Sequence, residues 1–287
     1  MNLHRWKDVD YRGKIVRIDY LAPNIEGDLW TKHANIYLPY GYDETKPYDI
    51  LYLIHGGGGN EDAWLDCSQI KNALDQAFRE KLAAPFIVVF PMFYNCIPTE
   101  HRKGLDAGWE SNQVLTFQKE FEENLIPAVE SRFHTYAKNA TPEGLKASRQ
   151  HRAFGGFSMG GSTTWFAFLH HLDIIATFLP LSGDCWAIEP LGGKTRTKET
   201  VALLCDTVKG FGYGKEDFKL LIGTGDKDIA YGNLTPQVEE MAAHPDLFDL
   251  QDDPAKGNLH YVVKENAPHA YEEVYHHIWN YLPYIFG

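Results

Sequence analysis

A serine set between glycines is the part of this sequence whose residue types most clearly indicate chemistry. Ser158 stands in the pattern G-x-S-x-G, with Gly156 before it and Gly160 after it. Small neighbours allow a turn tight enough to expose a serine hydroxyl where a strand meets a helix, which is the geometry of a nucleophile elbow. A glycine-rich turn can instead carry a serine that only caps the following helix, so the flanking sequence has to decide.

The flanking residues are those that a nucleophile elbow requires. Residues 152–156 have the composition of a short buried strand, and residues 163–169 are apolar enough for a helix that packs back on the sheet. A strand, a turn and a helix therefore follow one another in the order that the motif needs. The sequence predicts that Ser158 is a catalytic nucleophile.

A histidine and two carboxylates follow later strands. A serine hydroxyl is a weak nucleophile at neutral pH, so it needs a base and a carboxylate that orients the base. His269 follows the last predicted strand, residues 259–264, and lies on the loop before the terminal helix. Asp226 and Asp228 follow the preceding strand, residues 218–224. The order serine, acid, histidine suits an elbow serine, and position alone leaves either aspartate as the acid.

A run of one histidine and four glycines, residues 55–59, follows the apolar strand at residues 49–54. A tetrahedral intermediate carries negative charge on the former carbonyl oxygen, which backbone N–H groups without bulky side chains can approach. We expect Gly57 to supply one such donor, with Gly58 as the alternative, and Met159 to supply the other. The run does not read as a phosphate-binding loop, because no G-K-[ST] follows it.

The elements that must position these residues alternate along the chain. The predicted strands are residues 14–20, 33–38, 49–54, 86–90, 152–156, 177–182, 218–224 and 259–264. The predicted helices are residues 70–82, 114–133, 163–169 and 271–283. The first two strands alternate partly in polarity and should form an antiparallel edge, and the second helix should kink near Pro127. The fold class is therefore α/β, a mostly parallel central sheet of about eight strands with helices on both faces.

Two long segments, residues 92–112 and 183–217, follow strands and read as irregular loops. In a parallel sheet, ligands bind beyond the carboxyl ends of the strands, so both segments should overhang the site. Trp109 and Trp186 lie in these segments and are expected to line a pocket for an aromatic or sugar ring. The other aromatic candidates there are Phe93, Tyr94, Phe211 and Tyr213. Packing within the loops is the alternative for each of these side chains.

Composition excludes several classes of protein. The 287 residues carry a formal net charge of −12, which argues against a nucleic-acid or anionic-membrane partner. No apolar run is long enough to span a membrane, and residues 1–8 lack the apolar core of a signal peptide. We therefore expect a cytoplasmic protein, or a secreted one if a signal has been trimmed, with one domain over residues 1–287.

Metal and redox motifs are also missing from the sequence. The four cysteines are widely spaced and contain no C-x-x-C. Thirteen histidines are present, but residues 170–171 and 276–277 are adjacent pairs whose side chains diverge on a helix. We expect no metal.

Taken together, the motifs resemble carbohydrate esterase family 1 of the α/β-hydrolase fold, in particular the feruloyl esterase domains of bacterial xylanases. The resemblance extends from about Tyr37 to Phe286. The motifs that carry it are residues 52–61, 156–160, 180–186, 225–231 and 267–269. It implies that Ser158 is the nucleophile and His269 the base. It also selects Asp228 over Asp226, because the acid of the family ends a G-x-x-D sequence that an apolar residue follows.

The resemblance implies a function as well. The family cleaves ferulic and related hydroxycinnamic acids from arabinose side chains of xylan by two-step acyl transfer, without a cofactor, and some members remove acetyl groups instead. The expected substrate is thus a feruloylated saccharide or a small phenolic ester, with Trp186, Trp109 and Gly58 beside it. No xylanase, dockerin or carbohydrate-binding segment is found in this sequence.

Three alternatives stay open. The first two are an acetylxylan esterase and a thioesterase like S-formylglutathione hydrolase, and the third is transfer of the acyl group to an alcohol other than water. All three would use the same residues. A binding module that has kept the scaffold without activity is disfavoured, because binding would not need Ser158, Asp228 and His269 in register.

Overall fold

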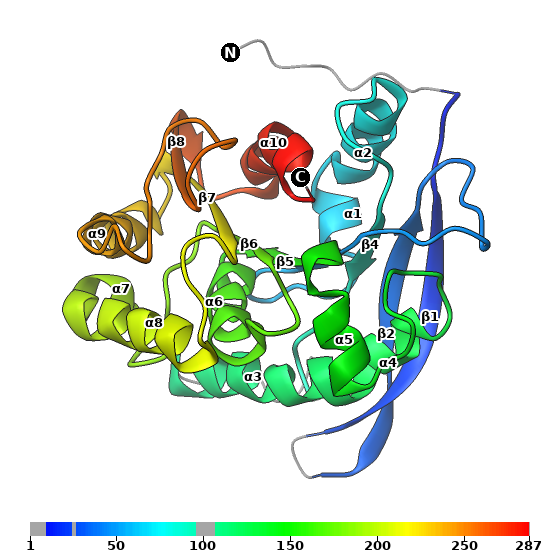
Figure 1. Cartoon of the computed structure of the whole chain (residues 1–287), viewed down its shortest axis with the longest axis horizontal. Helices are drawn as coiled ribbons and strands as arrows, with labels where there is room; N and C mark the ends of the chain where they lie inside the picture. The colour runs from blue at the N-terminus through cyan, green and yellow to red at the C-terminus, as the bar shows by residue number, and fades with distance from the viewer. Residues whose placement is uncertain (1–9, 25–26, 96–106, 287) are drawn as a thin grey trace.

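In the computed structural model the described residues are 10–24, 27–95 and 107–286, with the side chains of residues 107–111 outside that description. These residues form one sheet of eight strands in the order β1-β2-β4-β3-β5-β6-β7-β8 (Figure 1). The strands are β1 (Lys14–Pro23), β2 (Leu29–Leu38), β3 (Ile50–Ile54), β4 (Ile87–Phe90), β5 (Arg152–Phe157), β6 (Thr177–Leu181), β7 (Lys219–Lys227) and β8 (Leu259–Pro268). The predicted number of strands is confirmed.

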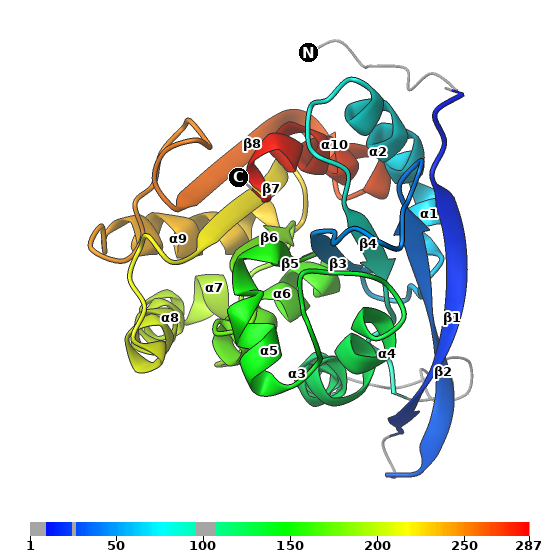
Figure 2. The same cartoon turned by 45° about the vertical axis from the view of Figure 1, so that its right-hand side comes forward.

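The sheet is antiparallel at one edge and parallel elsewhere. Strand β2 pairs antiparallel with both β1 and β4, whereas all pairs from β4 through β3 to β8 are parallel. Figure 2 shows the long β1–β2 ribbon along one side of the molecule. The predicted antiparallel edge and mostly parallel sheet are both confirmed. As a result, the carboxyl ends of β3, β5, β6, β7 and β8 share one edge, where the site residues follow their strands.

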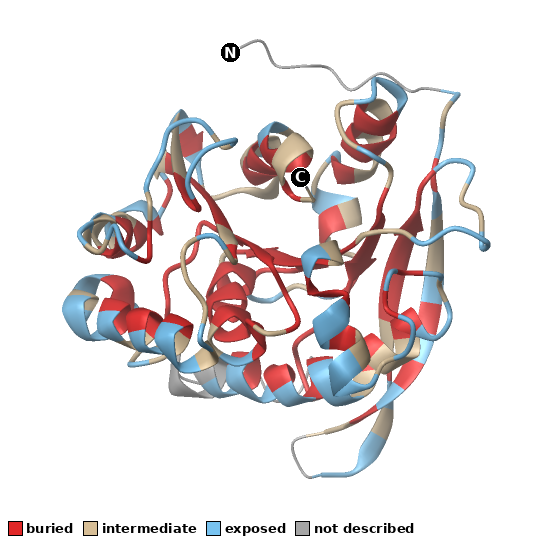
Figure 3. Ribbon diagram, in the orientation of Figure 1, coloured by how far each residue is buried: buried red, intermediate tan, exposed pale blue. Residues whose placement is uncertain are grey.

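Helices cover both faces of the sheet, as predicted. The helices are α1 (Ala63–Cys67), α2 (Ile70–Arg79), α3 (Ala107–Glu120), α4 (Ile126–Glu130), α5 (Pro142–Ala147), α6 (Met159–His171), α7 (Gly192–Thr195), α8 (Thr197–Phe211), α9 (Tyr231–Ala242) and α10 (Tyr271–Tyr281). Helices α1, α2 and α10 pack in one core on one face, and α3, α6, α8 and α9 pack in a second core on the other. The central strands are buried between these layers (Figure 3), which explains why β3 is apolar at every position.

The predicted helix over residues 114–133 is divided by a π-helical turn. Helix α3 is followed by the turn η1 (Phe121–Leu125) and then by α4. The N–H of Ile126 donates to the carbonyl of Phe121, five residues back, instead of the usual four. Pro127 has no N–H to donate, and its ring would clash with the carbonyl four residues earlier. The irregularity therefore lies in the turn before Pro127 and is a widened turn instead of the simple kink that we expected.

The expectation of an irregular segment over residues 183–217 is wrong. Helices α7 and α8 lie there, and the buried residues of α8 are Thr200, Val201, Leu204, Cys205 and Val208. Their spacing of three and four residues is that of an amphipathic helix. Gly212 ends α8 in a left-handed conformation with φ of 74°. The other long segment, residues 92–112, includes the start of α3, and its residues 96–106 lie outside the described part of the chain.

Within the described ranges, no helix combines the length and apolarity needed to span a membrane. The same ranges contain no group of three or more histidine, cysteine, aspartate or glutamate side chains placed to hold a metal ion.

Candidate active site

Ser158 lies on a strained turn between β5 and α6. Its φ of 59° and ψ of −119° are unusual for a residue with a side chain. A Cβ at Gly156 would lie 2.5 Å from the carbonyl oxygen of Gly160, and one at Gly160 would lie 2.6 Å from that of His55. Both glycines are therefore required by space. The Ser158 N–H donates to the carbonyl of Leu181 at 2.9 Å, which ties the turn to the end of β6.

A continuous chain of hydrogen bonds joins Ser158, His269 and Asp228. The Nε2 of His269 lies 2.8 Å from the Oγ of Ser158, and its Nδ1 lies 2.6 Å from Oδ1 of Asp228. In the tautomer with a proton on Nδ1, the imidazole donates to the carboxylate and its Nε2 can accept the proton of the serine. The three residues come from the ends of β5, β7 and β8. This arrangement can activate a hydroxyl for attack on a carbonyl carbon.

The structure brings Asp228, and not Asp226, to the histidine. Asp226 belongs to β7, and its Oδ2 lies 3.8 Å from the Nζ of Lys227. Asp228 follows the strand, is buried, and also accepts the N–H of Ala230 at 2.7 Å. That bond fixes the carboxylate in the orientation that faces His269.

The glycine loop after β3 lies next to the start of α6. A Cβ at Gly57 would lie 2.8 Å from the sulfur of Met159, so the two residues are in close contact. The N–H of Gly57 makes no hydrogen bond with another described backbone group or side chain. Met159 is the first residue of α6, and the first N–H groups of a helix have no partner within it. Two neighbouring donors beside Ser158 can thus receive an oxyanion.

Gly58 differs from Gly57, because its N–H already donates to the hydroxyl of Tyr94 at 2.8 Å. The N–H of Gly56 likewise donates to the hydroxyl of Tyr271 at 2.8 Å. The structure therefore favours Gly57 over Gly58 as the loop donor, and it gives Gly58 no free N–H to offer a substrate. From the sequence, Tyr94 is predicted only as a pocket aromatic, and no signal marks Tyr271 as a contact of this loop.

A cavity of about 310 Å³ opens beside Ser158 and His269. Trp186 lines it, as the sequence predicted, and donates from its indole N–H to Oδ1 of Asp184 at 3.1 Å. Asp184 is buried, which raises the pKa of its carboxyl group, and it also accepts the N–H of Gly193 at 2.9 Å. The carboxylate thereby fixes the wall that carries Trp186.

Further residues of the cavity wall were not foreseen. They include Leu191 before α7, Ile229 after Asp228, and Asn233 in the first turn of α9. Leu191 and Ile229 are large apolar side chains with exposed fractions of 43% and 77%. Ile229 follows Asp228 directly in sequence and could have been suspected, whereas Leu191 belongs to no motif.

The other predicted pocket aromatics pack elsewhere. Phe93 and Tyr94 are buried and stack on the ring of His55, with centroids 4.4 and 5.6 Å away. Phe211 stacks on Tyr213, outside the cavity wall. The side chain of Trp109 lies outside the described residues. Trp186 is thus the predicted aromatic that the structure places beside Ser158.

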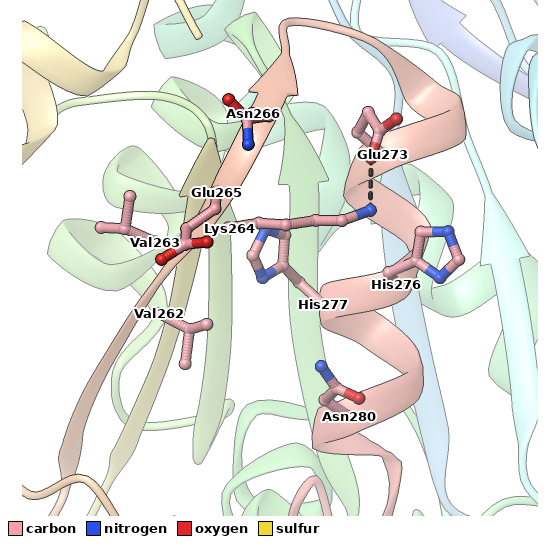
Figure 4. Close-up of a pocket in the computed structure, with 9 residues that line it drawn as sticks. All are labelled: Val262, Val263, Lys264, Glu265, Asn266, Glu273, His276, His277 and Asn280. Atoms are coloured by element: carbon pink, nitrogen blue, oxygen red, sulfur yellow. Dashed lines mark hydrogen bonds and ion pairs between the residues drawn. The ribbon is translucent and has the colours of Figure 1, made fainter. Parts of the chain in front are cut away.

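A second cavity, of about 510 Å³, lies between β8 and α10 (Figure 4). Most of the residues in its wall are polar or charged, and among them Lys264 pairs with Glu273. Ser158, Asp228 and His269 are not part of that wall. The smaller cavity is therefore the one that the reactive side chains face.

Comparison with known proteins places these features in context. The sequence model of the Esterase family ("Putative esterase") matches residues 30–285. The chain is 40% identical over 277 residues to endo-1,4-beta-xylanase Y of Acetivibrio thermocellus, and the match covers 96% of this chain and 23% of that protein. It is 29% identical over 190 residues to an endo-1,4-beta-xylanase/feruloyl esterase of Xylanibacter ruminicola, covering 64% and 23%. The chain thus spans less than a quarter of the length of these curated relatives.

Solved structures with the same fold include a serine-to-alanine mutant of the feruloyl esterase module from Clostridium thermocellum, complexed with sinapinate. It superposes with a TM-score of 0.85 at 38% identity, covering 100% of this chain and 92% of that one. A CE1 ferulic acid esterase from the anaerobic fungus Anaeromyces mucronatus superposes with a TM-score of 0.73 at 18% identity, covering 97% and 92%. The expected α/β-hydrolase fold is confirmed.

Proposed function

The chain belongs to the Esterase family, and from that premise we propose that it releases ferulic and related hydroxycinnamic acids from feruloylated saccharides or small phenolic esters. The observation that carries the proposal is the hydrogen-bonded chain from Ser158 through His269 to Asp228 beside a cavity lined by Trp186. The similarity to a feruloyl esterase module that binds sinapinate supports the substrate class.

In the first step Ser158 attacks the ester carbonyl carbon. His269 accepts the serine proton on Nε2, and Asp228 stabilises the resulting imidazolium through Nδ1. The carbonyl oxygen becomes an oxyanion, which the N–H groups of Gly57 and Met159 would receive. In well-studied cases one such donor contributes about 2.7 to 4 kcal/mol to transition-state stabilisation.

Collapse of the tetrahedral intermediate completes the transfer. The bond between the carbonyl carbon and the alcohol oxygen breaks, and His269 gives its proton to the departing sugar alcohol. A water molecule then attacks the acyl group on Ser158, with His269 again accepting a proton. The second tetrahedral intermediate releases the free acid and restores the serine.

The cavity supports an aromatic acyl group over an acetyl group. Trp186, Leu191 and Ile229 offer apolar surface that a phenyl ring can cover and that an acetyl group would leave wet. The proposal also includes that residues 1–287 form one esterase domain. The described residues support this because their strands form a single sheet.

Steady-state hydrolysis of methyl ferulate beside methyl acetate tests the proposal. For wild type we expect methyl ferulate to have the higher kcat/KM, and Ser158→Ala should lower kcat on it by at least about 10⁴-fold. Ser131→Ala, at an exposed serine, is the matched control and should leave the rate unchanged.

Two results would contradict the proposal. Turnover of the acetyl ester alone would indicate a deacetylase. Absence of any Ser158-dependent activity on either ester would point to the thioesterase or to the inactive scaffold.

A further inference from the structure

The glycine loop beside Ser158 is held by two tyrosine hydroxyls from distant parts of the chain. Tyr94 lies 36 residues after Gly58 in sequence, and Tyr271 lies 215 residues after Gly56. Each accepts one backbone N–H of the loop at 2.8 Å. In both bonds a backbone N–H of the loop donates to a tyrosine side chain, so the conformation of the loop depends on the positions of these two rings.

The ring of Tyr271 is fixed by its neighbours. It packs edge-on against Trp64, with centroids 4.9 Å apart, and against Phe157, with centroids 4.6 Å apart. The Phe157 ring in turn lies 4.5 Å from the ring of His269. Burial raises the pKa of Tyr271 to about 12, so its hydroxyl is protonated and neutral at pH 7.

The ring of Tyr94 is held equally firmly. It is 1% exposed, and it contacts Phe93 and His55 with centroid distances of 4.4 and 5.6 Å. The Nδ1 of His55 lies 2.7 Å from the carbonyl oxygen of Gly56. The contacting rings of Tyr94 and His55 thus make hydrogen bonds to the loop backbone at Gly58 and at Gly56.

These bonds leave one loop N–H available to a substrate. The N–H groups of Gly56 and Gly58 donate to tyrosine oxygens, whereas that of Gly57, a residue in contact with the Met159 side chain, has no partner among the described residues. Glycine has the largest backbone freedom of any residue, so a run of four glycines needs an external restraint to keep one orientation. An oxyanion donor contributes to catalysis only if it is oriented before the charge develops.

We propose that Tyr94 and Tyr271 are positioning residues of the oxyanion hole, which act by fixing the Gly57 N–H toward the carbonyl oxygen of the substrate. The proposal rests on the proposed function in one respect, because it requires acyl transfer to Ser158. It does not depend on the identity of the acyl group.

The experiment compares Tyr94→Phe, Tyr271→Phe and the double variant with wild type on p-nitrophenyl acetate. Each single change removes a hydroxyl and keeps the ring, and we expect kcat to fall about 5- to 50-fold while KM stays within threefold. The double variant should approach the loss of about 10² to 10³ that removal of one oxyanion donor produces.

A second readout separates orientation of the donor from general damage. A phenylboronic acid adds to the serine and forms a charged tetrahedral adduct, whereas free ferulate binds as a ground-state product. The inhibition constant of the boronic acid should rise by the same factor by which kcat falls, and that of ferulate should change by less than twofold.

Tyr281→Phe is the matched control. Tyr281 lies in the same helix as Tyr271, is buried, and donates its hydroxyl to a backbone carbonyl, that of Ile222, at 2.7 Å. Its loss should lower thermal stability but leave kcat and the boronic acid constant unchanged. If Tyr271→Phe fails to fold, Tyr94→Phe decides the matter.

The proposal is overturned if both single variants stay within twofold of wild type in kcat and in boronic acid binding. It is also overturned if boronic acid and ferulate binding weaken equally, or if Tyr281→Phe shows the same kinetic loss. Hydrolysis of p-nitrophenyl acetate without hydrolysis of methyl ferulate would reject the substrate class alone and leave the tyrosine test readable. Activity that persists in Ser158→Ala would reject both proposals.

Discussion

One oxygen of Asp228 accepts two hydrogen bonds, which fix the orientation of its carboxylate relative to His269. Oδ1 receives the N–H of Ala230 at 2.7 Å as well as Nδ1 of His269 at 2.6 Å. The side chain of Asp228 is fully buried, so water does not compete for these hydrogen bonds. A carboxylate so placed selects the tautomer of the histidine.

We therefore predict unequal effects at the two aspartates. Asp228→Asn should lower kcat by about 10³ to 10⁴, because an amide can offer its N–H to Nδ1 and stabilise the wrong tautomer. Asp226→Asn changes a side chain that contacts Lys227 instead of the histidine, and should stay within about threefold of wild type. Steady-state rates on one ester decide this, and equal losses or the reverse order would reject the assignment of Asp228.

At the scale of single residues, the sequence predicts what is local. Ser158 and its glycines form one short motif, and His269 follows from its place after the last strand. The sequence predicts Gly57 as the loop donor with Gly58 as the alternative. The contacts that distinguish the two come from Tyr94 and Tyr271, which are distant in the chain and could not be predicted from it.

Among elements, the segment from the end of β6 to α7 forms one wall of the cavity and carries Trp186. We predict that Trp186→Ala lowers the ratio of kcat/KM for methyl ferulate over methyl acetate by about tenfold, since an aromatic contact of this kind contributes on the order of 1 kcal/mol beyond its buried area. Phe211→Ala, at an aromatic outside the cavity wall, is the control and should leave the ratio unchanged. An unchanged ratio in Trp186→Ala would remove that residue from the acyl pocket.

A buried ion pair joins strand β2 to helix α3. Lys32 and Glu120 have side chains exposed by 0% and 1%, with Nζ and Oε1 2.7 Å apart. Nζ also donates to the carbonyl of Met92 at 2.8 Å, and the hydroxyl of Tyr20 donates to Glu120 at 2.7 Å. Burial raises the pKa of Glu120, while the nearby ammonium opposes that rise.

Lys32→Met should lower the free energy of unfolding by about 3 to 5 kcal/mol, because it leaves a carboxylate buried without its cation. The double variant with Glu120→Leu should recover much of the loss, since no charge is then left unpaired. Urea denaturation of both variants measures this. A double variant no more stable than the single one would show that the loss comes from packing.

The six strands from β3 to β8 could be predicted because buried parallel strands are continuous apolar runs with turn residues at their ends, and β1 and β2 because their residues alternate partly in polarity. Helix α8 is not predicted, although Val201, Leu204 and Val208 have helical spacing, because the whole segment 183–217 is interpreted as one irregular loop after a strand. Pro127 predicts an irregularity in this chain's helix over residues 114–133, but a proline alone does not distinguish a kink from the widened π-helical turn that the structure has.

For the molecule as a whole, buried histidines connect stability to pH. Burial lowers the pKa of His277 from its ordinary value of 6.5 to about 4, and that of His171 to about 3. Both folded values lie below those of the unfolded chain, so the unfolded chain binds more protons in the interval between them. The contribution of these two histidines to the free energy of unfolding is therefore fully present above pH 6.5 and is lost as the pH falls toward 4.

His277→Gln tests this dependence. In wild type each such histidine should contribute a slope of up to about 1.4 kcal/mol per pH unit between pH 4 and 6.5. The variant should lose about one histidine's share of that slope, whatever its stability at neutral pH. His276→Gln, at the adjacent and half-buried position, is the control and should keep the slope. Parallel curves for wild type and His277→Gln, from chemical denaturation at several pH values, would refute the prediction.

The π-helical turn limits how the length of this chain can change. Helix α4, which follows the turn, holds Glu130 in a two-pronged ion pair with Arg152, the first residue of the strand that leads to Ser158. Loss of one residue from the turn would rotate α4 by about 100° relative to α3 and carry Glu130 away from Arg152. Insertions and deletions should thus be tolerated in surface loops but not between α3 and α4, and relatives that align without gaps there are expected to share the same widened turn.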